Sequence, residues 1–147
     1  MTLPKVDQLV PFLVAGFAAA ASDLSRRLKG MPAENMLLMI GWPALWVGVE
    51  TIRTQLGFSW NALGVSQYRN LGLIQCAAWG GVGVVSFILV LVSSALALTF
   101  ERYMAQGRCC ARRPSFELMA AALVLAAAVL GGNRTLRGLA QSRTNLR

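Results

Sequence analysis

Hydrophobic positions in this chain gather into long uncharged runs instead of alternating with polar positions. The longest run is Asn70–Phe100. A helix rises about 1.5 Å per residue, so about 20 residues cross the hydrocarbon core of a bilayer. This run is longer than that. Three shorter runs reach the required length when flanking polar residues are included. The pattern therefore predicts transmembrane helices near residues 6–26, 34–54, 74–100 and 115–133.

The longest run divides into two parts. Its first residues, Asn70 to about Leu73, are expected at the membrane interface, with the span entered through Gly80–Phe87. The preceding loop, residues 55–70, carries the aromatic residues Phe58, Trp60 and Tyr68 and a single charge, Arg69. Amphipathic aromatic side chains are favoured where membrane meets water. The expected fold is all-α, a polytopic membrane protein with a bundle of about four transmembrane helices and an interfacial aromatic loop.

Composition and charge agree with a membrane protein. Of the 147 residues, 56% are hydrophobic and only 14% are charged, and the mean hydropathy is +0.55. The net charge of +8 raises the question of nucleic-acid binding. No soluble basic domain is left once the apolar runs are removed, so no nucleic-acid partner is expected. The N-terminus could pass for a signal peptide, but Asp7 and the later apolar runs favour a retained helix.

The basic residues indicate an orientation. Loops 23–33 and 101–114 are rich in arginine and lie on the same side of an even number of crossings. The positive-inside rule makes that side cytoplasmic, so loop 55–70 faces outward. The domain division is then a transmembrane domain over residues 1–133 and a basic tail over residues 134–147. The tail arginines would also lie outside, against the rule, unless the tail is not a natural free end.

Few residues offer chemistry of their own. The chain has no histidine, and Cys76, Cys109 and Cys110 do not form a CxxC pair. No metal site, cofactor or catalytic residue is therefore expected. Ser66 has no histidine to activate it as a nucleophile. No span carries a mid-membrane charge of the kind that transport pathways use.

One stretch of about 50 residues resembles the membrane domain of apolipoprotein N-acyltransferase. The resemblance lies in an Ala-Leu-Trp-Val…Glu…Arg helix, a Gly-Phe…Trp loop and a Gly-Val-rich start of the next helix. The sequence departs from the family pattern at Thr51, Ser59 and Val65. The matching residues are Ala44, Leu45, Trp46, Val47, Glu50, Arg53, Gly57, Phe58, Trp60, Leu63, Gly64, Ser66, Gln67, Gly81, Val82, Gly83, Val84, Ser86 and Phe87.

The resemblance implies an activity that this chain is not expected to perform alone. Family members carry a periplasmic nitrilase-like domain whose Glu-Lys-Cys set takes an acyl chain from phospholipid and passes it to the N-terminal amine of a lipoprotein. That domain is expected to be absent here, which indicates a fragment that is inactive alone. The tail weakly echoes the start of the first nitrilase strand. The implied location is the bacterial inner (cytoplasmic) membrane, multi-pass, and the implied partners are membrane phospholipid and, if the missing domain is supplied, a lipoprotein substrate.

Six residues are candidates for contact with lipid or its head group, and each has a plainer alternative. Glu50 and Arg53 could brace the loop or meet a head group, or could form an interfacial ion pair at a helix end. The aromatic residues could line a groove for acyl chains or form an aromatic belt. The polar side chains of the loop could bind a phosphate or satisfy interfacial backbone groups. The candidates are Glu50, Arg53, Phe58, Trp60, Gln67 and Tyr68.

A second hypothesis belongs to a different class of protein. The chain could be a small stand-alone integral membrane protein that binds lipid or a partner and catalyses nothing. A natural stop codon with its own downstream promoter would favour this hypothesis, and a frameshift after codon 147 would favour the fragment.

Overall fold

The structure is a computed structural model that describes residues 6–31, 33–57, 62–106 and 116–144. Every regular element in these ranges is helical. The elements are α1 (Val6–Leu28), α2 (Glu34–Gln55), the 3-10 helix η1 (Leu63–Gln67), α3 (Leu71–Ile74), α4 (Ala77–Gly80), α5 (Val82–Gln106) and α6 (Phe116–Thr144).

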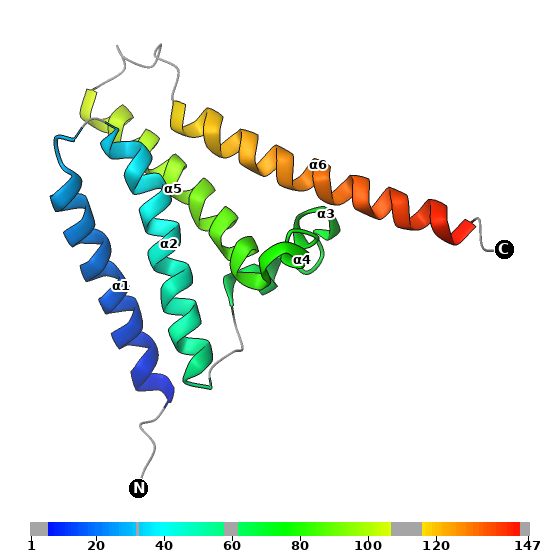
Figure 1. The fold of residues 1–147 in the computed structure, drawn as a ribbon. Helices are drawn as coiled ribbons and strands as arrows, with labels where there is room; N and C mark the ends of the chain where they lie inside the picture. The colour runs from blue at the N-terminus through cyan, green and yellow to red at the C-terminus, as the bar shows by residue number, and fades with distance from the viewer. Residues whose placement is uncertain (1–5, 32, 58–61, 107–115, 145–147) are drawn as a thin grey trace, which may run out of the picture.

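The long helices form a fan around α5. Helix α1 packs against α2, and α2 packs against α5. Helix α6 lies close to α5 at the end where residues 107–115 connect them, and it diverges from α5 toward the C-terminus (Figure 1). The short helices α3 and α4 lie in the opening between α5 and α6 (Figure 1). Helices α3 and α4 therefore occupy the space that the divergence of α5 and α6 leaves between them.

Three of the long helices have the length and composition of membrane spans. They are α2, residues Val82–Met104 of α5 and residues Phe116–Gly138 of α6. Residues 71–80 form a shorter apolar segment. Large apolar side chains also face outward, such as Leu123, which is 72% exposed, and Leu130, which is 60% exposed. An all-α polytopic membrane fold is therefore confirmed, while a crossing by α1 stays a prediction.

The longest apolar run is broken, in contrast to the helix expected over residues 74–100. Helix α3 ends at Ile74, α4 ends at Gly80, and the long helix α5 begins only at Val82. The break falls at Gly81, whose φ of 72° and ψ of −168° suit glycine and almost no other residue. Its backbone N–H still donates to Ala77 O at 2.7 Å. The glycine thus lets the chain change direction without leaving this donor unpaired.

Helix α6 is longer than the span expected over residues 115–133. It continues to Thr144 and so includes most of the segment that was expected to be a separate basic tail. Leucine, alanine, arginine and glutamine are strong helix formers, and they are frequent in this segment. Residues 134–144 are therefore helical, whereas the family resemblance suggested the extended start of a strand.

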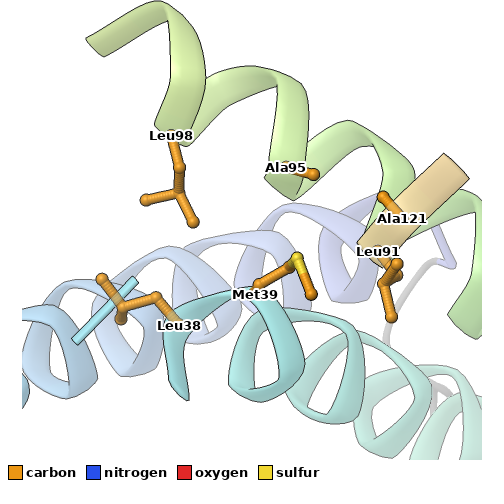
Figure 2. Close-up of a cluster of buried hydrophobic side chains, with 6 residues drawn as sticks. All are labelled: Leu38, Met39, Leu91, Ala95, Leu98 and Ala121. Atoms are coloured by element: carbon orange, nitrogen blue, oxygen red, sulfur yellow. The ribbon is translucent and has the colours of Figure 1, made fainter. Parts of the chain in front are cut away.

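Two apolar clusters hold the helices together. The first joins α2, α5 and α6 through Leu38, Met39, Leu91, Ala95, Leu98 and Ala121 (Figure 2). Ala95 is fully buried and Ala121 is 2% exposed. Lipid tails are as apolar as leucine, so membrane helices associate through close packing, which small residues allow. The second cluster joins α3 to α5 through Leu73, Val85 and Ile88.

Helix α3 meets α6 through two glycines. A Cβ atom built on Gly132 would lie 1.8 Å from Gly72 O, and one built on Gly72 would lie 2.8 Å from Asn133 Oδ1. Both glycines are buried. The backbones therefore touch directly, and this contact fixes the distance between α3 and α6.

Candidate functional site

The loop after α2 is attached to that helix by a buried carboxylate. Glu50 is 8% exposed. Its Oε1 accepts a hydrogen bond from the Trp46 indole Nε1 at 3.1 Å and another from the backbone N–H of Leu63 at 2.7 Å. Leu63 is the first residue of η1, where backbone N–H groups have no partner within the helix. Glu50 therefore satisfies a donor that would be costly to leave unpaired away from water.

The same loop is attached to α5 by a buried hydroxyl. Ser86 is fully buried, and its Oγ accepts a hydrogen bond from the backbone N–H of Gly64 at 2.8 Å. A Cβ atom on Gly64 would lie 2.6 Å from Val82 O. Glycine is therefore required for this approach. We call the four residues Glu50, Leu63, Gly64 and Ser86 the loop latch, since they join α2 and α5 through η1.

Replacing Ser86 with alanine is expected to weaken the loop latch. The buried N–H of Gly64 would lose its acceptor, which costs about 1–3 kcal/mol. The matched control is Ser93→Ala on the same helix. Ser93 is exposed, and its Oγ donates only to Leu89 O within α5, so the expected change is within about 0.5 kcal/mol. Unfolding of both variants in mixed micelles measures the difference, and equal stabilities would show that the Gly64 bond contributes nothing.

The structure also places the other residues that the sequence singled out. Arg53 is half-buried and lines a cavity of 40 Å³ with Glu50, Trp46 and residues of α1. Ligand pockets usually measure about 300–1,000 Å³, whereas this volume suits water. The Glu50 carboxylate accepts hydrogen bonds from Trp46 and from the backbone of Leu63, so it joins the loop to α2.

The remaining candidates lie on the exposed side of the loop or outside the described ranges. Tyr68 is 61% exposed, and the guanidinium of Arg69 lies 5.5 Å from its ring centre. Gln67 Nε2 lies 3.4 Å from Ser66 Oγ, and Ser66 Oγ donates to Leu63 O at 2.7 Å. Ser66 thus satisfies a backbone carbonyl. Phe58 and Trp60 lie outside the described residues.

A second polar cluster joins three helices at the opposite end of the bundle from η1. Glu117, at the start of α6, is bonded by Arg102 near the end of α5, and its Oε1 accepts from Asn35 Nδ2 at 3.1 Å. The Glu117 side chain is 8% exposed and that of Arg102 is 33% exposed. In the sequence, Arg102 stands out only as one of the arginines of loop 101–114, and this cluster was not predicted. The sequence indicates the cluster only weakly, through a glutamate, Glu117, at the start of an apolar run.

No group of three potential metal ligands among His, Cys, Asp and Glu comes together in the part of the chain that the structure describes. The hydrogen bonds of Glu50 and Ser86 attach the short helix η1 to α2 and α5, and they leave the side chain of Tyr68 exposed.

A comparison with known families shows which family the chain belongs to. Residues 8–95, more than half of the chain, match the apolipoprotein N-acyltransferase N-terminal domain. The chain belongs to this family. All four residues of the loop latch lie inside the matched region, whereas α6 and its Glu117 lie beyond it.

Individual relatives give the same result. An apolipoprotein N-acyltransferase of Geobacter metallireducens is 48% identical over 93 residues, which cover 62% of this chain and 17% of the relative. One of Chromobacterium violaceum is 33% identical over 100 residues, which cover 67% of this chain and 19% of the relative. Apolipoprotein N-acyltransferase 1 of Treponema pallidum is 39% identical over 83 residues, covering 53% and 15%. The chain thus spans less than a fifth of the length of these relatives. None of the solved structures matches it.

Proposed function

We propose that this chain supplies part of the membrane domain of an apolipoprotein N-acyltransferase and serves lipoprotein maturation. The observation that carries the proposal is the family match over residues 8–95, which contains the whole loop latch. The overall reaction would transfer an acyl chain from phospholipid to the N-terminal amine of a lipoprotein. The nitrilase-like domain of the family would perform the covalent chemistry, so these residues would act by positioning.

The positioning role rests on the attachment of η1. Two buried acceptors, Glu50 Oε1 and Ser86 Oγ, hold adjacent backbone N–H groups of η1. A loop held on both sides keeps a fixed position relative to the spans. The exposed Tyr68, together with Gln67, Phe58, Trp60 and Arg53, would contact phospholipid near the head group. The protein would reside in the bacterial inner membrane with this loop on the outer side.

A chimera tests the proposal. Residues 8–95 of this chain would replace the matching segment of the Geobacter metallireducens enzyme, in cells depleted of their own acyltransferase. Mass spectrometry of a lipoprotein N-terminus reports the added acyl chain. The chimera is expected to restore N-acylation, and Glu50→Leu in the chimera to reduce it by about tenfold, the effect expected of about 1.4 kcal/mol in positioning.

The controls separate positioning from general damage. Glu34→Leu removes a glutamate from the other end of the same helix, where it accepts a bond from Gly30 N. This variant is expected to keep N-acylation. A chimera that folds in the membrane but does not acylate would contradict the proposal. So would N-acylation of a lipoprotein peptide by the purified chain alone with phospholipid.

A further inference from the structure

Helix α1 packs on the side of α2 that carries Glu50. Trp46, Glu50 and Arg53 are spaced by four and three residues, so they share one face of α2. These three residues line a small cavity together with Leu13 and Val14 of α1. Among the described elements, α2 is the one helix that α1 contacts (Figure 1). The contact between α1 and α2 therefore includes the face that bears the carboxylate of the loop latch.

Trp46 connects α1 to this carboxylate. Its ring is perpendicular to that of Phe17 on α1, with 5.2 Å between the ring centres, an arrangement that aromatic pairs favour. Both aromatic side chains are half-buried. The indole Nε1 of Trp46 donates to Glu50 Oε1 at 3.1 Å. Phe17 thus packs against the indole whose N–H reaches the carboxylate.

The same carboxylate oxygen holds the loop. Glu50 Oε1 also accepts from the backbone N–H of Leu63 at 2.7 Å. A glutamate side chain is flexible and loses rotamer freedom when it is fixed in one geometry. The indole donor of Trp46 favours the rotamer in which the oxygen reaches Leu63, so the acceptor is pre-organised before the loop meets it.

A second tryptophan on α2 lacks this connection. Trp42 lies four residues before Trp46, and its side chain packs against the first apolar cluster. Its indole Nε1 is buried and has no hydrogen-bond partner within the described ranges. The two tryptophans therefore differ in one respect that can be tested, since the N–H of Trp46 alone of the two is bonded to the loop latch.

We propose that Trp46 is a positioning residue that holds η1 through Glu50, and that α1 supports it through Phe17. The connection passes from the Phe17 ring to the indole, from the indole N–H to the carboxylate, and from the carboxylate to the loop. Helix α1 thus acts on η1 without touching it. The placement of η1 does not depend on acyl transfer, whereas the effect on N-acylation rests on the proposed function.

Amide hydrogen exchange of the full chain in nanodiscs, followed residue by residue, tests the placement of η1. Exchange at the Leu63 N–H reports on its bond to Glu50. Trp46→Phe keeps an aromatic ring but removes the indole N–H, and it is expected to speed this exchange about tenfold. Trp42→Phe is the matched control and is expected to change it less than about twofold. Amides of α5 should keep their rates in both variants, because a general loss of stability would speed them as well.

A second pair of variants tests the support from α1. Phe17→Leu removes the ring that packs against the indole and is expected to speed exchange at Leu63 about fivefold. Phe12→Leu removes a ring of the same helix that is 74% exposed, and a change of less than about twofold is expected. Unchanged exchange at Leu63 in Trp46→Phe or in Phe17→Leu, or equal acceleration in a variant and its control, would overturn the proposal.

A double-variant cycle in the chimera tests whether Trp46 acts through Glu50. Trp46→Phe alone is expected to reduce N-acylation about fivefold. Added to Glu50→Leu, it is expected to reduce N-acylation less than about twofold further, because the carboxylate that it positions is then absent. A general structural role would give the same loss in both backgrounds, and that result would overturn the proposal. A chimera that does not acylate contradicts the proposed function instead, and exchange in the full chain still decides the placement of η1.

Discussion

Replacing Gly132 with alanine is expected to be among the most damaging single changes in this protein. The added methyl group would sit 1.8 Å from the backbone oxygen of Gly72. A backbone atom held by Leu73 in a buried cluster cannot move aside as a flexible side chain can. Helix α3 and α6 must therefore separate, and overpacking of this kind costs about 1–3 kcal/mol and sometimes more. We expect the upper end of that range in equilibrium unfolding in mixed micelles.

The neighbouring glycine provides the control. Alanine at Gly131 would meet no atom within 4 Å, and it raises helix propensity by about 1 kcal/mol relative to glycine. Gly131→Ala is therefore expected to be neutral or stabilising. If Gly132→Ala unfolds at the same denaturant concentration as Gly131→Ala, then α3 and α6 do not touch as the structure describes.

Replacing Arg102 with methionine is the second change with a large expected effect. It would leave the Glu117 carboxylate, whose side chain is 8% exposed, without its charged partner. Breaking a buried ion pair costs about 3–5 kcal/mol, and the 33% exposure of Arg102 places the expected loss toward the lower end. Helix α6 should loosen first, so proteolysis of the α5–α6 connection reports the effect together with equilibrium unfolding.

Two further variants make this prediction specific. Arg27→Met breaks the ion pair with Asp23, in which Nε and Oδ2 are 2.6 Å apart and the side chains are 75% and 49% exposed. Exposed pairs contribute about 0–1 kcal/mol, so little change is expected. The double variant Arg102→Met with Glu117→Met removes both charges and should regain most of the stability. Failure of this rescue would mean that Glu117 does not depend on Arg102.

The sequence predicted an all-α membrane fold because hydrophobic length is a property of each segment alone. Helix α2 has nearly the bounds that the pattern predicts, whereas α5 begins and ends later and α6 extends further. The break at Gly81 shows the limit. A run of apolar residues indicates burial in lipid, but a positive φ at one glycine decides whether the run is one helix or several.

For the loop after α2, the sequence indicated candidate residues but not the contacts that they make. Glu50 was singled out as a brace or ion pair, and its actual partners are an indole four residues earlier and a backbone N–H in the loop. Ser86 appeared only as a member of a matching motif, and its bond to Gly64 spans 22 residues of sequence. Gly72 and Gly132 lie on different helices, so no helical spacing in the sequence indicates that they meet. Contacts of this kind depend on how the spans are arranged in space.

The divergence of α6 from α5 gives the molecule a wedge shape. The helices meet at one end, held by Asn35, Arg102 and Glu117, and spread at the other (Figure 1). With α5 and α6 both crossing a bilayer, we expect this part of the protein to occupy more area in the leaflet where they are apart. Lipids on the wide side must pack around a larger perimeter, so the protein should concentrate in bilayers whose curvature relieves that crowding, and a partner helix that fills the wedge would abolish the preference.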